Sequence, residues 1–359
     1  MKTNIYILYG GRSAEHEISL QSAMAVINGL DKQKYVIHPV YIGKDGTWQA
    51  GAPVDEGTVI DDKEQLKTLA HQSLFHSLGN FLLECFKKNE KSIIFPVLHG
   101  PNGEDGTIQG LLELLDIPYV GNGVLASALG MDKAVMKDLL TKEYIPQSHY
   151  MVLKYQDWQE NKEHSYTEVE EVIGYPCFVK PARLGSSIGI SRCESRETLG
   201  KAIQEAFLYD HKLVIEQEII GREMQIAVLG NHQPQSSVVG EFILERPFMD
   251  YDAKYVDGKL LPIIPAKLSP EVSRAMRDMS LKVFKLLNCQ GIARIDYFVT
   301  KEEQFYVNEV NTMPGFTKQS MTPALWNQTD GTTYSQLLDK LIQLGFEAYE
   351  EKKSIVIGR

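Results

Sequence analysis

The sequence predicts an α/β protein of two or three domains, the first of which is a Rossmann-like open sheet. A chain of 359 residues is too long to fold around a single hydrophobic core. Its first apolar run, residues 5–9, is followed by two glycines and a helical pattern over residues 14–30, with Ser13 as the expected N-cap. A second apolar run, residues 92–98, also ends at a glycine-containing turn. Strand, glycine turn and helix in this order are typical of a doubly wound domain.

Composition excludes several classes of protein. With 43% hydrophobic and 23% charged residues, the chain is an ordinary globular protein, and its net charge of -10 argues against a nucleic-acid partner. No apolar run approaches the roughly 20 residues that span a bilayer, so we expect no membrane partner and a cytoplasmic location. The four cysteines show no CxxC spacing, which indicates reduced thiols rather than zinc ligands or a disulfide framework: Cys85, Cys177, Cys193 and Cys289.

The first region continues with a strand over residues 35–41 and a helix over residues 107–115, and we expect it to close at residue 121. His99 follows the strand that ends at residue 98. Ligands of open α/β sheets bind at the carboxyl ends of the strands, although a single histidine there is as often structural. Glu15 lies in a first helical turn, where any helix favours an acidic residue.

The second region carries the stronger functional signal. A helix is predicted over residues 125–140, with Lys133 and Lys137 one turn apart on what charge patterning predicts to be a solvated face. Residues 158–165 read as a surface insertion. A strand at residues 177–181 then leads into the loop ARLGSSIG. Its two glycines and two serines, next to Lys180, suit phosphate oxygens, whereas a plain hairpin turn is the alternative.

The third region contains a hairpin with an unusual pair of carboxylates. Strands are expected on both sides of a turn at residues 301–304, which places Asp296 opposite Glu309 and Arg294 opposite Asn311. One face of the hairpin is expected to carry six side chains: Arg294, Asp296, Phe298, Val307, Glu309 and Asn311. Two facing carboxylates with an amide oxygen suit Mg²⁺. A solvent-facing strand pair is the alternative.

Other elements complete this region. Strands are predicted over residues 213–218 and 224–229, and helices over residues 270–287 and 334–353. Residues 247–255 are aromatic and charged without clear period, as in a functional lid.

Eight motifs, in order along nearly the whole chain, resemble the D-alanine:D-alanine ligases, ATP-grasp enzymes of peptidoglycan precursor synthesis: GGRSAEHEIS, LHGPNGEDGTIQG, MDKAVMK, FVKPARLGSSIGIS, VIEQEIIGRE, DYDAKY, RIDYF and NEVNTMPGFTKQSM. The resemblance implies a three-domain ATP-grasp fold, with an N-terminal substrate domain over residues 1–121 and ATP-grasp subdomains over residues 122–216 and 217–359. Met249 departs from the family, which often has a tyrosine at this lid position.

The resemblance implies ATP and two Mg²⁺ ions, for which Mn²⁺ can substitute. The positions that match the nucleotide site are Lys133, Lys180, Ser187, Glu216, Gln217, Ile219, Glu223 and Lys254. Among them the lysines and the serine match the phosphate contacts, and Glu223 matches the ribose contact. The positions that match the metal ligands are Asp296, Glu309 and Asn311, in agreement with the hairpin.

The implied reaction joins two D-alanines through an acyl phosphate. Glu15 matches the partner of the first ammonium, linked through Ser186 to Tyr255 of the lid, and Arg294 and the Gly315 N–H match the groups that stabilise the oxyanion. Three further positions match the substrate pockets: His99 for the first D-alanine, and Ser320 and Met321 for the second. The family is commonly homodimeric. D-alanine:D-lactate ligation, another carboxylate-amine ligation and a non-catalytic nucleotide-binding module are the alternatives.

Overall fold

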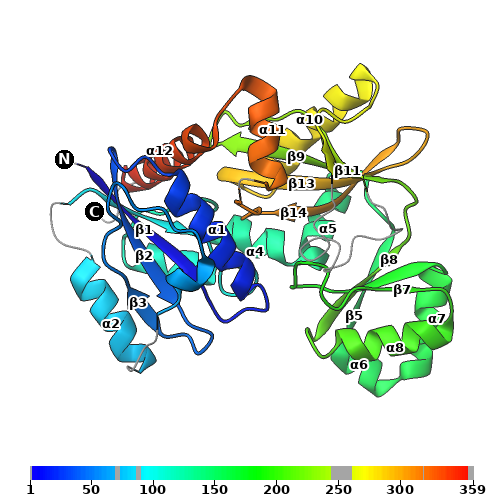
Figure 1. Cartoon of the computed structure of the whole chain (residues 1–359). Helices are drawn as coiled ribbons and strands as arrows, with labels where there is room; N and C mark the ends of the chain where they lie inside the picture. The colour runs from blue at the N-terminus through cyan, green and yellow to red at the C-terminus, as the bar shows by residue number, and fades with distance from the viewer. Residues whose placement is uncertain (1, 69–72, 86–89, 244–260, 318, 355–359) are drawn as a thin grey trace.

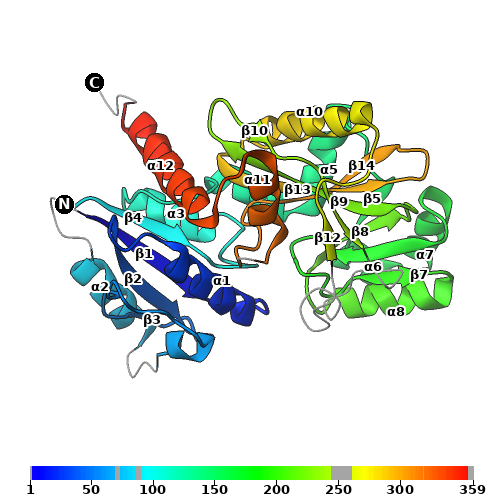
Figure 2. The same ribbon diagram turned by 45° about the horizontal axis from the view of Figure 1, so that its top comes forward.

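The computed structural model of the chain describes residues 2–68, 73–85, 90–243, 261–317 and 319–354. Three β-sheets form three lobes that meet at the centre of the molecule, with the N- and C-terminal segments in the same lobe (Figures 1 and 2). The α/β class and the N-terminal open sheet predicted from the sequence are confirmed. In the part of the chain described here, no helix is both long and apolar enough to cross a membrane.

The first sheet is the predicted open sheet. Its strands run in the order β3-β2-β1-β4, with β1 parallel to both neighbours: β1 (Thr3–Gly10), β2 (Tyr35–Ile42), β3 (Trp48–Ala50) and β4 (Ser92–Pro96). Successive side chains of β1 enter opposite cores, because residues alternate faces along a strand. Ile5 and Ile7 pack with one set of helices, and Tyr6 and Leu8 with another.

Helices cover both faces of this sheet. The helices and the 3-10 turn η1 around it are α1 (His16–Gly29), η1 (Lys63–Leu66), α2 (Leu74–Cys85), α3 (Thr107–Leu114) and α12 (Tyr334–Lys353). The prediction for the start of α1 was wrong. Ser13 does not cap the helix: its hydroxyl accepts a hydrogen bond from the backbone N–H of Glu15, and the helix begins at His16. The chain therefore turns once more before the helix, which leaves Glu15 at the sheet edge.

The second sheet is antiparallel, in the order β5-β8-β6-β7: β5 (Tyr150–Lys154), β6 (Cys177–Pro181), β7 (Ser191–Cys193) and β8 (Lys212–Gln217). One face packs against α6 (Tyr155–Glu160), α7 (Lys162–Val172) and α8 (Arg196–Ala206). The expected surface segment at residues 158–165 is confirmed only in part: residues 159–164 are exposed, whereas Trp158 and Ser165 at its ends are buried, and Trp158 packs into this core.

One predicted helix is two helices in the structure. The segment expected to be continuous over residues 125–140 divides into α4 (Val124–Met131) and α5 (Lys133–Lys142). Asp132 separates them because its backbone is extended and its side chain accepts a hydrogen bond from the Val135 N–H, which starts a new helix. The break turns Lys133 and Lys137 inward, so the predicted solvated face was also wrong: both lysines are buried.

The third sheet has the path β12-β11-β9-β13-β14, with β10 on β9: β9 (Arg222–Gly230), β10 (Gln235–Ser236), β11 (Gly240–Ile243), β12 (Leu261–Ile263), β13 (Gly291–Val299) and β14 (Phe305–Asn311). Helix α10 (Pro270–Leu286) packs on one face, and α11 (Met321–Asp330) on the other. The predicted final helix and the predicted hairpin are confirmed, as is the helix now labelled α10 to within one residue.

The hairpin register is confirmed at the charged end and wrong near the turn. Asp296 pairs with Glu309, and Arg294 with Asn311, as predicted. A β-bulge follows, so Tyr297 rather than Phe298 lies opposite Val307. Asn308 is the extra residue, and it reverses the face of every β14 residue closer to the turn. Val307 is therefore buried in the core beside α10 rather than sharing a face with the carboxylates.

Candidate active site

Buried charges gather where the uncovered face of the second sheet meets α5 and the hairpin. Glu216 of β8 is 3% exposed, and Lys180 Nζ donates to its Oε2 at 3.0 Å. Lys137 Nζ lies 3.5 Å from the other oxygen, Oε1, and donates to Ser148 Oγ at 3.0 Å, and Ser148 Oγ donates in turn to Glu216 Oε2 at 2.9 Å. Lys180 also reaches Asn308 Oδ1, at 3.3 Å, and so connects the sheet to the bulge of the hairpin.

This cluster shifts the pKa of its members in ways that burial and charge explain. Burial raises the pKa of the Glu216 carboxyl, but the charges of Lys137 and Lys180 outweigh it and lower the pKa to about 2. The pKa of Lys137 is lowered, because the cost of burying its charge exceeds the attraction of Glu216. Glu216 is thus a carboxylate at neutral pH. Its Oε1 is buried and accepts no hydrogen bond among the described residues, which leaves one acceptor for a ligand N–H.

A second buried carboxylate, Glu15, lies at the edge of the first sheet. Ser186, in the loop between β6 and β7, donates a short hydrogen bond to Glu15 Oε1. Burial raises the pKa of Glu15, the negative charge of Glu104 adds to the rise, and the Ser186 hydrogen bond opposes it. Glu15 Oε2 is buried without a hydrogen-bond partner in the described part of the chain. A Cβ at Gly100 would lie 2.5 Å from that oxygen, so only glycine fits there.

His99 lies beside this carboxylate. Its Nε2 is 3.0 Å from Ser22 Oγ, and its Nδ1 is 3.8 Å from Glu104 Oε1. Burial lowers the pKa of His99, but the carboxylates of Glu104 and Glu15 outweigh burial and raise it. Two carboxylates and one histidine therefore form a buried acidic group that attracts a cation such as an ammonium.

Lys133 lies between the loop after β6, the Glu15 carboxylate and the Glu309 carboxylate of the hairpin. Its Nζ donates to the Leu184 carbonyl at 2.8 Å and lies 3.7 Å from Glu309 Oε2, and its charge lowers the pKa of Glu15. The loop itself holds two serines in the left-handed region, Ser186 at φ 54° and Ser187 at φ 57°. The loop therefore does connect a hairpin, as the alternative interpretation had it, but with a constrained backbone between two functional groups.

The carboxylate pair of the hairpin is balanced by cations. Arg294 donates to both oxygens of Asp296, at 2.7 and 2.8 Å, and Asn311 Nδ2 lies 3.2 Å from Asp296 Oδ2. Gln225, on β9, donates to the same oxygen at 3.2 Å. Asp296, Glu309 and Asn311 lie at one end of the hairpin, and their carboxylate and amide oxygens are the donors that Mg²⁺ prefers, although Asn311 turns its Nδ2 toward Asp296 here.

The remaining predicted positions fall around this centre in different ways. Ser320 accepts a hydrogen bond from the Thr317 N–H at 3.0 Å, and a Cβ at Gly315 would lie 3.1 Å from its Oγ, so these residues form one tight turn. Met321 is buried in the core below them. Gln217, Ile219 and Glu223 follow Glu216 at and beyond the end of β8. Lys254, Tyr255 and Met249 lie outside the described residues.

Sequence reasoning missed residues that complete these clusters. Lys137 was assigned to a solvated surface, and Glu104, Ser148 and Asn308 were not singled out. The signal for Lys137 was its spacing: it lies one helical turn from Lys133, on the side of the helix that also carries the apolar residues Ala134, Met136 and Leu140.

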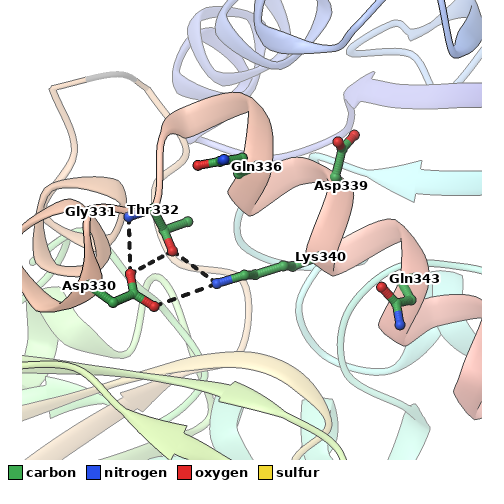
Figure 3. A pocket seen from close by; sticks show the side chains of 7 residues that line it. All are labelled: Asp330, Gly331, Thr332, Gln336, Asp339, Lys340 and Gln343. Carbon is green, nitrogen blue, oxygen red and sulfur yellow. Dashed lines mark hydrogen bonds and ion pairs between the residues drawn. The ribbon is translucent and has the colours of Figure 1, made fainter.

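A cavity of about 470 Å³ lies elsewhere, at the junction of α11 and α12, and none of the predicted site residues lines it. Its polar groups bond to each other: Thr332 Oγ1 donates to Asp330 at 2.6 Å, and Lys340 Nζ donates to Thr332 Oγ1 at 2.9 Å (Figure 3). We therefore place the reaction centre at the carboxylate and lysine clusters and not in this cavity.

Comparison with known proteins identifies the family of the chain. The family described as the D-ala D-ala ligase N-terminus matches residues 4–122, and the D-ala D-ala ligase C-terminus matches residues 139–343. A D-alanine-D-alanine ligase of Bacillus cytotoxicus is 47% identical over 357 residues, covering 99% of this chain and 98% of the relative. One from Macrococcus caseolyticus is 48% identical over 354 residues, covering 99% and 98%.

Solved structures give the same result. The D-alanine-D-alanine ligase of Coxiella burnetii superposes with a TM-score of 0.80 at 34% identity, covering 98% of this chain and 96% of that one. The VanG D-Ala:D-Ser ligase of Enterococcus faecalis superposes with a TM-score of 0.79 at 33% identity, covering 96% and 100%. The two family models match most of the chain, and each of these relatives and structures covers nearly all of it. This chain belongs to the D-alanine-D-alanine ligase family.

Proposed function

We propose that this chain uses ATP to join two D-alanines into D-alanyl-D-alanine, the dipeptide of peptidoglycan precursors. The observation that carries the proposal is a pair of buried carboxylates, each with one oxygen that accepts no hydrogen bond among the described residues: Glu15 Oε2 and Glu216 Oε1. Lys133, the first residue of α5, contacts both the loop after β6 and the hairpin. Glu216 Oε1 has the Lys137 ammonium at 3.5 Å rather than a hydrogen-bond donor, and both oxygens suit the N–H group of a ligand.

The nucleotide fits the Glu216 end. An exocyclic amine of adenine would satisfy Glu216 Oε1, with Gln217 and Ile219 beside the base and Glu223 at the ribose. The phosphates would then extend toward Lys180, Lys133 and Ser187. Lys254, which lies outside the described residues, matches a further phosphate contact.

Asp296, Glu309 and Asn311 would hold two Mg²⁺ ions against these phosphates. When bound, Mg²⁺ offsets the phosphate charge that accumulates during phosphoryl transfer, and Mn²⁺ can replace it. Arg294 and Lys133 balance the charges of Asp296 and Glu309 in this structure, and Mg²⁺ would take over that charge compensation when it binds. Arg294 can also turn from Asp296 toward the substrate oxyanion, together with the Gly315 N–H.

The first D-alanine fits the Glu15 end. Its ammonium would occupy Glu15 Oε2, beside His99 and opposite the Ser186 hydroxyl. Its carboxylate attacks the γ-phosphorus of ATP, and the bond between that phosphorus and the bridging oxygen breaks, so ADP leaves and an acyl phosphate remains. Lys133 is placed to balance the transferred charge.

The second D-alanine completes the reaction. Its carboxylate would bind at the turn of Ser320 and Met321, where the Ser320 hydroxyl can serve as a donor. Its amine, having lost a proton, attacks the acyl carbon, and phosphate leaves as the amide forms. We propose that Tyr255 closes the site through Ser186. We also propose a cytoplasmic homodimer, without nucleic-acid or membrane partners.

The test is release of ADP and phosphate from ATP and Mg²⁺ in the presence of D-alanine, with L-alanine as the matched control. We expect release with D-alanine and not with L-alanine, and D-alanyl-D-alanine as the product. Release that is equal with both enantiomers, or that yields no dipeptide, would contradict the proposal.

The alternative with a hydroxy acid or serine as second substrate is separated by competition. Because the attacking amine must be unprotonated, the yield of dipeptide should rise toward alkaline pH, whereas the yield of a D-lactate ester should not depend on that ionisation. We expect the dipeptide to dominate at neutral pH. An excess of ester, or of D-alanyl-D-serine over D-alanyl-D-alanine at equal concentrations, would identify the chain with another second substrate.

A further inference from the structure

Two cysteines are paired at the end of the β6–β7 hairpin farthest from its serine loop, residues 182–189. Cys177 begins β6 and Cys193 ends β7, and the antiparallel register pairs them directly. Both side chains are fully buried in the core formed with α6, α7 and α8. The proposed reaction uses neither of them, and their spacing in the sequence does not reveal that they meet.

Their placement meets the geometric requirement of a disulfide. Directly opposed residues of antiparallel strands have Cα atoms about 4.5–5.5 Å apart. Disulfides form across Cα separations of roughly 4.4–6.8 Å. Because the two residues are directly opposed, their side chains lie on the same face of the hairpin, and the interaction between the thiols lowers the pKa of Cys177 and raises that of Cys193. The sulfur atoms therefore face each other already, and the reduced pair has one thiol that ionises more readily.

We propose that Cys177 and Cys193 form a reversible oxidation site, at which a hydroperoxide converts the two thiols into a disulfide across the β6–β7 hairpin. One thiolate attacks a peroxide oxygen, the O–O bond breaks, and a sulfenic acid forms while hydroxide leaves. The second thiol then attacks the sulfenic sulfur, an S–S bond forms, and water leaves. Two thiols and one hydrogen peroxide thus give one disulfide and two waters. Peroxide suits a buried pair because it is nearly as small as water.

The disulfide would brace the loop without entering the reaction centre. Side chains alternate along β6, so Cys177 and Val179 face the helices whereas Lys180 faces Glu216 on the opposite side. The new bond would tie together the two strands on which Ser186 and Ser187 are mounted. The expected consequence is a hairpin that is harder to unfold, with the charges around Glu216 unchanged.

The experiment treats the full-length protein with hydrogen peroxide under native conditions, blocks remaining thiols with an alkylating agent after unfolding, and maps the peptides. We expect a linked Cys177–Cys193 peptide that a reducing agent removes. Cys289→Ser is the matched control, because it removes another buried thiol and should leave the link intact. Cys193→Ser should abolish it. The urea midpoint of the oxidised protein should lie higher than that of the reduced protein by on the order of 1 M.

The wild-type peptide map decides the proposal even if a variant does not fold. Two results would overturn it: both thiols remaining alkylatable after peroxide treatment of the folded protein, or their conversion to sulfinic or sulfonic acid without a link. A link that forms only in urea would also overturn it, because the native register would then play no part.

Discussion

At the residue scale, the site consists of charges that are paired before any ligand arrives. Asp296, Glu309, Glu216 and Glu15 each have a cationic or hydroxyl partner within the chain. These partners lower the cost of burying the carboxylates. Ligand binding then replaces or adds partners rather than creating charge in an apolar site.

The first prediction concerns Glu309. Glu309→Gln keeps the volume of the side chain and removes its charge, so we expect a normal fold and a loss of turnover on the order of 10²-fold or more. Steady-state kinetics over a range of Mg²⁺ concentrations, with circular dichroism for the fold, measure both effects. Glu302→Gln is the control on the turn of the same hairpin, where the side chain is exposed. Near-normal turnover of Glu309→Gln would remove Glu309 from the metal site.

The second prediction concerns Lys137, the fully buried lysine that the sequence misplaced. Lys137→Met leaves Glu216 with one cation instead of two, so the pKa of Glu216 should rise from about 2 and the free energy of unfolding at neutral pH should fall by about 3–5 kcal/mol. Urea unfolding measures this loss. Lys142→Met, at an exposed position at the end of the same helix, should change little. Equal losses in both variants would argue against a specific role for the buried charge.

The difference in unfolding free energy between the wild-type protein and Lys137→Met should change with pH in one direction. A carboxyl whose folded pKa is depressed stabilises the protein above its unfolded pKa, here 4.5, and loses that contribution as the pH falls toward about 2. The gap between the wild-type protein and Lys137→Met should therefore be widest above pH 4.5 and narrow in acid. A gap that widens on acidification would contradict the assignment.

At the element scale, strand register and loop backbone decide where those residues lie. Alternation predicted that Asp296 faces Glu309, and it was correct because the bulge lies on the turn side of that pair. It failed for Val307, because a single extra residue, Asn308, exchanges the two faces and no local composition marks it. The bulge also brings Asn308 to Lys180. The extra residue that made the predicted register wrong near the turn therefore also connects the hairpin to the second sheet.

The third prediction concerns the serine loop. Ser186→Gly and Ser186→Ala both remove the hydrogen bond to Glu15, but only glycine relaxes the left-handed backbone at φ 54°. Since hydrogen bonds to charged groups are worth about 1.5–3 kcal/mol, kcat/KM for D-alanine should fall about 10-fold or more in both variants. The lost bond should also raise the pKa of Glu15, so the acidic limb of the pH profile should move to higher pH. Wild-type kinetics in Ser186→Gly would show that only backbone shape matters.

At the scale of the whole molecule, segments that are distant in sequence build one site. Asn122 fastens the first lobe to the hairpin, donating to the carbonyls of Ile292 at 2.6 Å and Thr312 at 2.8 Å. The C-terminal helix α12 returns to the first sheet, where Asp339 accepts from Lys34 at 2.7 Å and Tyr35 at 2.8 Å (Figure 2). The domain boundaries after residues 121 and 216 stay predictions.

Sequence patterns predicted the fold class and most of the elements because periodicity is local. The bounds of α12 were predicted to the residue, and the strand predicted over residues 5–9 lies within the longer β1. Burial is not local: Trp158 and Lys137 were placed at the surface, and each is buried by an element outside its own segment. The family motifs identified more of the candidate site residues than periodicity did, because they mark positions that are distant in sequence and meet only after folding.

The central claim is that a D-alanine carboxylate attacks ATP, and transfer of a heavy oxygen isotope tests it most directly. D-alanine labelled in both carboxylate oxygens is turned over with ATP and Mg²⁺, and the phosphate and dipeptide are analysed by mass spectrometry. We predict one labelled oxygen in each phosphate released, because the C–O bond of the acyl phosphate breaks when the second amine attacks. Phosphate without the label, formed together with dipeptide, would contradict the acyl phosphate and the function proposed for this site.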